Sequence, residues 1–136
     1  MQIQEITLAL MIDIDKPVDI PHSWVKRISE TDKYAVLLKS HPSMFRIVTT
    51  QMPVITEFYL DLTTLEEDFL EFIFKQIDFL KLKPLYSSGV CFMDEQCYYL
   101  FFVDGDRTDI ADDVSNALKE IKGVKDVTIK TYAFKK

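Results

Sequence analysis

Glycine, cysteine and proline are scarce in this chain, which has 3 Gly, 2 Cys and 5 Pro among its 136 residues. So little glycine and proline excludes a flexible linker or a low-complexity tract, and we find no internal repeat. A glycine-rich phosphate-binding loop is also missing. Hydrophobic residues make up 48% of the chain, which is enough to fill a core. We therefore expect one compact structural unit.

Long apolar runs are absent as well. No stretch approaches the roughly 20 residues that a membrane-spanning helix needs. The N-terminus lacks the basic segment, apolar core and small-residue cleavage site of a secretory signal. We therefore expect a cytoplasmic protein that makes no contact with a membrane.

Positive charge is in the minority, because 16 Lys and Arg stand against 22 Asp and Glu, giving a net charge of −6 at pH 7. Residues 1–53 hold six of each sign, so the whole acidic excess lies in residues 54–136. Nucleic acids are bound largely by neutralising their phosphates. An acidic chain without a basic stripe predicts no direct nucleic-acid binding, and we expect the aromatic run from Tyr98 to Phe102 to pack in a core.

The two cysteines, Cys91 and Cys97, lie on either side of a predicted hairpin turn. A turn of two or four residues puts them on opposite faces of the hairpin, where they cannot bridge, whereas a turn of three residues puts them directly opposite. We expect small, buried, reduced thiols, as is usual in the cytoplasm. Together with His22 and His41 they lack the ligand spacing of a zinc site, so we expect no metal and no cofactor.

No pattern of catalytic residues is recognisable. The acidic run at Asp104-Gly105-Asp106 has its glycine in the wrong place for a calcium loop and no glutamate closing twelve residues, so helix capping explains it better. The histidines have no nucleophile or orienting acid nearby in sequence. We expect a protein that is not an enzyme, and a site assembled only by folding remains an alternative.

Residues 54–134 show the order strand, helix, strand, strand, helix, strand. Apolar residues from Ile110 to Ile121 recur at helical spacing, and after Gly123 the chain alternates with period two to Tyr132. Residues 89–92 and 97–103 are two apolar runs joined by a short polar connection, which is typical of a hairpin. This order predicts an α+β fold of the ferredoxin-like βαββαβ sandwich type.

The first helix of this unit is predicted to begin near Thr63 or Thr64, because Thr64 and Glu67 have the spacing of a capping box. Its apolar residues cover far more of the helix than the stripe needed to sit on one sheet. They are Leu65, Phe69, Leu70, Phe72, Ile73, Phe74, Ile77, Phe79 and Leu80. Another structure must therefore cover the remainder.

We expect residues 1–53 to form a β-rich N-terminal half packed on the rest, residues 54–136, with a seam near Met52-Pro53. Period-two alternation predicts strands at residues 6–14, 34–39 and 45–50, and one helical turn is expected near Trp24. We expect this half either to extend the sheet or to pack a second small sheet on the aromatic helix. The alternative is that a second copy of the chain covers that helix.

The C-terminal third resembles the end of the N-terminal sensor region in archaeal regulators of the bacterio-opsin-activator type. The matching segments are GVCFMDEQCYYLFFVDGD, TDIADDVSNALKEIKG and VKDVTIKTYAF, and HSWVKRIS with FRIVTTQ resembles the earlier part of such regions. The resemblance implies a sensing module that precedes a helix-turn-helix domain. Since the sequence stops at Lys136, we expect an excised regulatory portion or a stand-alone relative. The βαββαβ order also resembles ACT-type small-molecule-binding domains.

These observations favour a non-catalytic regulatory or sensor domain that binds an unidentified small molecule or partner as a homodimer, and the resemblance implies that it is the regulatory part of a transcriptional regulator. The candidate ligand-binding residues are Trp24, His41, Phe72 and Tyr99. A protein–protein interaction module without a small-molecule ligand is the first alternative, and a small enzyme with a fold-assembled site is the second.

Overall fold

A computed structural model describes residues 7–40, 43–63, 67–92 and 96–134. Within these residues the fold is α+β, with six strands in two antiparallel sheets and three α-helices. The chain divides into two compact units, Met1–Glu30 and Thr31–Lys136. None of the described helices is both long and apolar enough to cross a membrane.

The first unit contains one short helix, α1 (His22–Lys26), which confirms the helical turn expected near Trp24. The strand predicted at residues 6–14 is wrong, because residues 7–14 adopt no strand conformation and Ile6 lies outside the described residues. Their apolar side chains are exposed, up to 95% for Met11. Alternation alone does not make a strand, since a strand also needs a neighbour to receive its backbone hydrogen bonds.

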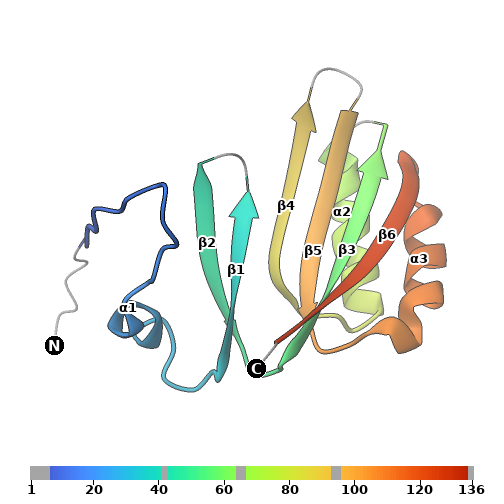
Figure 1. The fold of residues 1–136 in the computed structure, drawn as a ribbon. Coiled ribbons are helices and arrows are strands. Elements are labelled where there is room, and N and C mark those ends of the chain that lie inside the picture. The colour runs from blue at the N-terminus through green and yellow to red at the C-terminus, as the bar shows by residue number, and fades with distance from the viewer. Residues whose placement is uncertain (1–6, 41–42, 64–66, 93–95, 135–136) are drawn as a thin grey trace, which may run out of the picture. The chain divides into compact units, whose positions relative to one another are not determined.

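The second unit is built on a four-stranded antiparallel sheet with the strand order β4-β5-β3-β6 (Figure 1). Helix α2 follows β3, and helix α3 follows β5 after one 3₁₀ turn, η1 (Thr108–Ile110). The bounds are β3 Val54–Leu62, α2 Glu67–Phe79, β4 Pro84–Phe92, β5 Gln96–Asp104, α3 Ala111–Lys119 and β6 Val124–Ala133.

The main core lies between one face of this sheet and both helices. Alternate residues of β3 point into it, and Phe58, Leu60 and Leu62 are fully buried there. On β6, Val127 and Ile129 pack against this core at the edge of the sheet. The helices contribute Phe69, Ile73 and Ile77 from α2 and Val114 and Leu118 from α3.

Helix α2 buries one apolar stripe and, in the described part of the chain, leaves its other large apolar side chains exposed. Phe69, Ile73 and Ile77 are spaced by four residues and form the buried stripe. Four large apolar residues on its flanks are exposed, namely Leu70, Phe72, Phe74 and Phe79. The predicted capping box at Thr64 lies outside the described residues.

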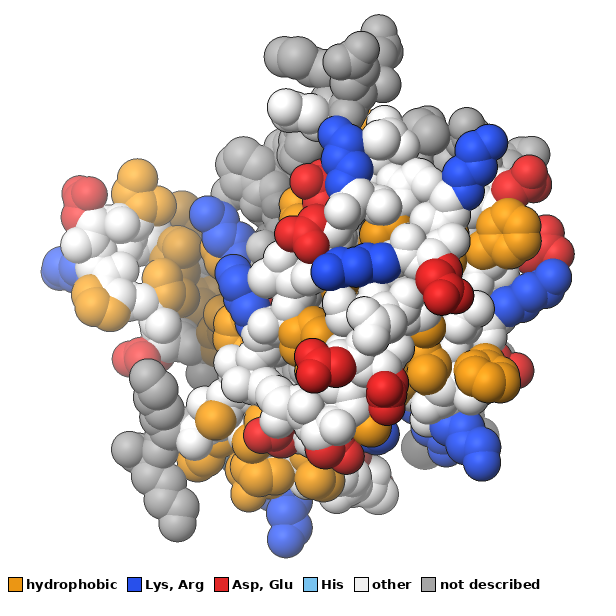
Figure 2. Space-filling view, turned by 90° about the vertical axis from the view of Figure 1, so that its right-hand side faces the viewer, with side chains coloured by type: hydrophobic (Ala, Val, Ile, Leu, Met, Phe, Trp, Pro, Cys, Tyr) orange, Lys and Arg blue, Asp and Glu red, His pale blue; other side chains and the backbone are white. Residues whose placement is uncertain are grey.

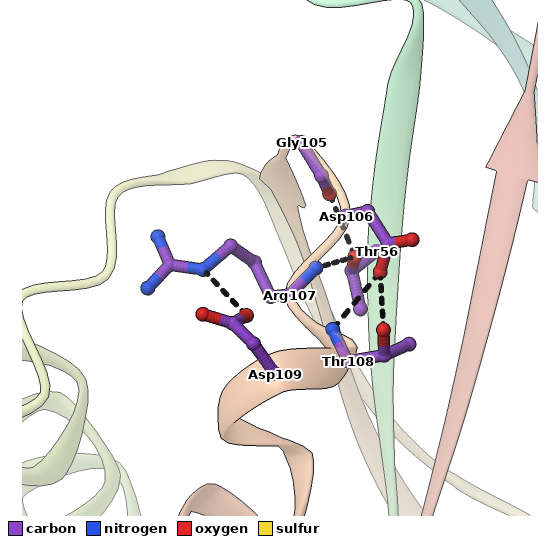
Figure 3. Close-up of polar contacts among 6 residues, drawn as sticks. All are labelled: Thr56, Gly105, Asp106, Arg107, Thr108 and Asp109. Carbon is purple, nitrogen blue, oxygen red and sulfur yellow. Dashed lines mark hydrogen bonds and ion pairs between the residues drawn. The ribbon is translucent and has the colours of Figure 1, made fainter.

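The loop from β5 to α3 is fixed by a buried hydroxyl (Figure 3). Thr56 on β3 donates to the carbonyl of Gly105 at 2.7 Å and accepts from the backbone N–H of Arg107 at 2.9 Å. Gly105 has φ +81°, a conformation that favours glycine. Asp106 accepts hydrogen bonds from the N–H and hydroxyl of Thr108, which lower the pKa of its carboxyl. The acidic run therefore shapes the turn into η1.

Strands β1 (Tyr34–Ser40) and β2 (Met44–Thr50) form a separate two-stranded sheet and confirm the two strands predicted here. The expectations that they extend the main sheet or pack on the aromatic helix are both wrong. Leu38 of β1 is buried with Ile55 and Phe102, which point to the sheet face opposite the helices. The cause is that β3 and β5 carry apolar residues on both faces, so the outer face also needs a cover.

The expectation of reduced cysteines is wrong as well, because Cys91 and Cys97 form a disulfide. The two residues are direct partners across β4 and β5, with Cα atoms 4.0 Å apart. Phe92 pairs with Gln96, so the hairpin has the three-residue connection that places both cysteines on one face. The connecting residues 93–95 themselves lie outside the described part of the chain.

Candidate functional site

A cavity of about 240 Å³ lies between β1 and the outer face of the four-stranded sheet. Its apolar wall is formed by Val36 and Leu38 of β1 facing Leu100 and Phe102 of β5. Further lining residues come from four strands: Leu37, Lys39 and Ser40 of β1, Glu57 of β3, Tyr86 of β4 and Tyr132 of β6. The cavity is thus apolar at its floor with a few polar groups around it, as is common for small-molecule sites.

Three of the contacts between the β1–β2 hairpin and the sheet help to form this cavity. At the end of β2, the Thr50 hydroxyl donates a hydrogen bond to the carboxylate of Asp104 on β5. The guanidinium carbon of Arg46 lies 5.6 Å from the centre of the Tyr86 ring, a cation–π contact between β2 and β4. The third contact is the buried cluster around Leu38.

Glu57 is the carboxylate of the cavity. It is half-buried, and its Oε1 accepts a long hydrogen bond of 3.4 Å from the Tyr132 hydroxyl. Burial, the charge of Glu57 and this hydrogen bond raise the pKa of Tyr132. Lys130 is the cross-strand partner of Glu57 on β6, yet no ion pair joins the two within the described structure.

The acidic and aromatic character continues along the outer face beyond the cavity. Tyr59 and Tyr98 are stacked with ring centroids 5.4 Å apart. Burial raises the pKa of Tyr59, and the negative charge of Asp61 adds to the effect. Tyr59 therefore presents a neutral ring beside the carboxylates of Asp61 and Glu57.

A second cavity of about 190 Å³ adjoins the first and shares Val36, Leu37 and Tyr132 with it. It is lined by the ends of β1, β3 and β6, including Ile55 and Phe134. The Tyr132 side chain therefore borders both cavities. Its ring also packs against Phe102, at 6.3 Å between centroids.

Of the four residues predicted from the sequence as ligand-binding candidates, the three that the structure describes do not line either cavity. Trp24 is half-buried on α1 of the first unit, and His41 lies outside the described residues. Phe72 is exposed on α2. Tyr99 is buried between sheet and helices, against Phe69, and among the described residues its hydroxyl has no hydrogen-bond partner.

Sequence reasoning did not identify Glu57, Tyr86 or Tyr132 as site residues. The signal was present in β3, where Glu57, Tyr59 and Asp61 alternate with the buried Phe58 and Leu60. Three polar or aromatic residues on one face of a central strand indicate an outer face with its own chemistry. Only the position of the β1–β2 hairpin turns this face into a cavity.

Among the described residues, no group of three or more His, Cys, Asp or Glu side chains is placed to hold a metal ion. On the side of the molecule formed by α3 and β6, acidic and basic side chains are interspersed with isolated hydrophobic ones (Figure 2). No protein-family model matches this chain, and no curated protein sequence matches it either.

Proposed function

We propose that this chain is a non-catalytic regulatory domain that senses a small molecule, and that residues 54–134 form a ferredoxin-like sandwich. The element order β3-α2-β4-β5-α3-β6 and the strand order β4-β5-β3-β6 support the fold proposal. A fold of this type carries many functions, so the functional proposal depends on the site.

The observation that carries the functional proposal is the cavity of about 240 Å³ between β1 and the outer sheet face. Its walls combine five apolar side chains with one carboxylate, two tyrosine rings, one lysine and one serine. Such a lining suits reversible binding, in which the apolar part supplies affinity and the polar groups supply orientation.

The position of the cavity favours sensing. One wall belongs to the β1–β2 hairpin and the other to the four-stranded sheet. A molecule that contacts both walls binds only while the hairpin is docked, so it shifts the population towards the docked arrangement. In a longer regulator this shift would be the signal that reaches a DNA-binding domain, as in the sensor regions that the sequence resembles.

The experiment that tests this proposal is a thermal-shift screen of the chain against a metabolite library. A ligand at one hundred times its dissociation constant adds about 2.7 kcal/mol of stability, which a melting curve detects readily. The variant Leu100→Phe, which fills the cavity, should lose the shift. Val90→Phe lies on the same sheet face outside the cavity and is the matched control, which should keep it. A shift retained by Leu100→Phe would contradict the proposal.

We also propose that the domain forms a homodimer through α2. Its exposed flanks carry Phe72, Phe74 and Phe79, and between them Glu71 pairs with Lys75 at 3.3 Å. Two α2 helices could pack antiparallel through their exposed sides, crossing at the level of Ile73 along the helix axis. Glu71 of each copy would then lie opposite Lys75 of the other, so the surface is complementary to itself. Sedimentation velocity tests this, because a chain that stays monomeric at high concentration would contradict the dimer.

The same exposed helix favours one alternative function, a protein–protein interaction module. Exposed phenylalanines at helical spacing are typical anchors for a groove on a partner protein. Purification of a distinct partner that requires α2, together with no small-molecule response, would favour this alternative.

A further inference from the structure

We propose that the ligand of the cavity is a small organic cation, an amine whose ammonium group lies beside Glu57 and whose apolar body lies on Leu38, Leu100 and Phe102. This inference rests on the proposed function and adds the chemical class of the ligand. It is carried by the arrangement of charge, rings and space in the cavity.

The charge argument begins at Glu57. Its carboxylate is half-buried at the cavity wall, and the hydrogen bond from Tyr132 satisfies only one of its acceptor positions. A carboxylate that lines a cavity and lacks a cationic partner among the described residues attracts an ammonium group, which donates up to three hydrogen bonds.

The rings of the cavity favour the same charge. Tyr86, Phe102 and Tyr132 present aromatic surface, whose faces are electronegative and attract cations. The structure already contains one example, since the Arg46 guanidinium lies over the Tyr86 ring at 5.6 Å. An anionic ligand would meet both the carboxylate and these ring faces unfavourably.

Besides Arg46, which lies over the Tyr86 ring, two lysines stand near the cavity and oppose the binding of a cation. Lys39 lines it from β1 and is exposed, and Lys130 is the exposed cross-strand neighbour of Glu57. Because exposed charges are screened by water, each opposes an incoming cation less than the half-buried Glu57 attracts it. Removing Lys130 should therefore increase affinity for an amine, whereas removing the charge of Glu57 should decrease it.

The size of the cavity limits the ligand to about one ring with a short chain. A cavity of about 150 Å³ holds a benzene molecule, and this one measures about 240 Å³. Phenethylamine matches that size and carries one ammonium group. 2-Phenylethanol and 3-phenylpropanoate have nearly the same shape with a neutral and a negative head group, so they separate charge from size.

The test is isothermal titration calorimetry of these three compounds with the full chain and its variants. We expect phenethylamine to bind at least tenfold more tightly than 2-phenylethanol and 3-phenylpropanoate. Glu57→Gln should weaken the amine at least fivefold while leaving the alcohol within twofold, and Lys130→Gln should strengthen the amine about twofold or more. Glu120→Gln, an exposed glutamate after α3, is the charge-matched control and should change nothing.

Melting curves of every variant establish that it folds, and Gln at position 57 still accepts the Tyr132 hydrogen bond. If the alcohol or the carboxylate binds as tightly as the amine, and Leu100→Phe abolishes that binding, the cation inference is overturned while the proposed sensing function stands. If none of the three compounds binds at millimolar concentration and the metabolite screen also gives no shift, both are overturned.

Discussion

Glu57 shows how a single position on β3 acquires a chemical role from its neighbours. The residues before and after it, Thr56 and Phe58, point into the core and are fully buried. Glu57 therefore points to the outer face, where Tyr132 donates to it and the β1–β2 hairpin limits its access to water. The carboxylate is placed by strand alternation and given its surroundings by tertiary packing.

The contact between Tyr132 and Glu57 predicts a pH dependence of stability. The pKa of Tyr132 is raised in the folded state, so the folded chain holds the phenolic proton more tightly than the unfolded chain. The contribution is present below the unfolded value, about 10, and is lost as the pH rises through the folded value. We expect the free energy of unfolding to fall in this range, and Tyr132→Phe to make the fall shallower by less than about 1 kcal/mol, since the side chain is 46% exposed.

Urea denaturation between pH 8.5 and 11 measures this effect. Tyr34→Phe is the control, because it also removes one tyrosine hydroxyl, from a ring that packs on Phe134 at 5.5 Å between centroids. An identical pH profile for Tyr132→Phe and the wild-type chain would show that the contact with Glu57 contributes nothing in solution.

Removing the Thr56 hydroxyl should lower the free energy of unfolding by more than the Tyr132→Phe substitution does. Thr56→Val keeps the size of the side chain and removes both its hydrogen bonds, leaving the Gly105 carbonyl and the Arg107 N–H unsatisfied beside the core. We expect a loss of about 1–3 kcal/mol in the free energy of unfolding. Thr56→Ser keeps the hydroxyl and should lose about 1 kcal/mol or less, for one methyl group. Equal losses for both variants would mean that the methyl group, and not the hydroxyl, matters at this site.

At the scale of elements, α2 has two kinds of apolar residue that its sequence does not distinguish. Ile73 is fully buried against the sheet, whereas Phe72 beside it is half exposed. Ile73→Ala should cost about 2–5 kcal/mol of unfolding free energy because it leaves a cavity in the core. Phe72→Ala should cost no more than about 1 kcal/mol in the monomer. Chemical denaturation at low protein concentration compares the two, and similar costs would contradict the orientation of α2.

The disulfide at the β4–β5 hairpin predicts that the stability of the chain depends modestly on redox conditions. The bridge closes a loop with a sequence separation of only 6. Chain-entropy arguments give about 2 kcal/mol as its contribution for so short a loop. The cross-strand ladder remains after reduction, so the chain should stay folded and melt at a lower temperature. Melting curves with and without dithiothreitol measure this, with Cys91→Ala/Cys97→Ala as the control that should not respond. Labelling of free thiols in the untreated, denatured chain would show that the bridge does not form.

Most elements from β1 onward could be predicted from the sequence because each has a strong local signal, although β4 begins at Pro84, five residues before the strand predicted at residues 89–92, and η1 was not predicted. The alternation in β6 and the helical spacing in α3 depend on residues a few positions apart, and the structure agrees with both. The strand predicted at residues 6–14 failed because its apolar residues find no pairing neighbour in the described chain. Whether the two cysteines can form a disulfide depends on whether the turn between them has three residues or one more or one fewer. The alternation of apolar residues in the strands does not determine that length.

The candidate site could not be predicted from the sequence, because several separate strands contribute to it. Its walls come from β1, β3, β4, β5 and β6, which are far apart in sequence. Each contributes a residue or two that looks ordinary alone, such as Glu57 or Tyr86. Only the docking of the β1–β2 hairpin on the outer face, through Leu38 and Thr50, brings them together.

At the scale of the whole molecule, the second unit has a sheet covered on both faces, by helices on one and by the β1–β2 hairpin on the other. The two covers differ in kind. The helix side contains the large core, and the hairpin side contains a smaller cluster with a cavity beside it. We therefore expect ligand binding on the hairpin side and self-association on the outer surface of α2.

The homodimer proposal predicts that charge on α2 separates the copies. Phe74→Glu with Phe79→Glu replaces two exposed rings, one of them 80% exposed, with carboxylates that would face their own copies. We expect at least a tenfold weaker dimerisation constant by sedimentation velocity, and an unchanged monomer melting curve. Phe45→Glu, an exposed phenylalanine on β2, is the matched control and should leave the dimer intact. Equal weakening by Phe45→Glu would place the interface elsewhere.

The most direct test of a ligand site beneath the β1–β2 hairpin is a methyl-NMR experiment on the chain with its tightest small-molecule binder. We predict intermolecular nuclear Overhauser effects from the ligand to the methyl groups of Leu38 and Leu100, which line the cavity. The methyl groups of Leu118, buried on the helix side of the sheet, should show none. Contacts to Leu118 or to Leu70 on α2, without contacts to Leu38 and Leu100, would contradict the account.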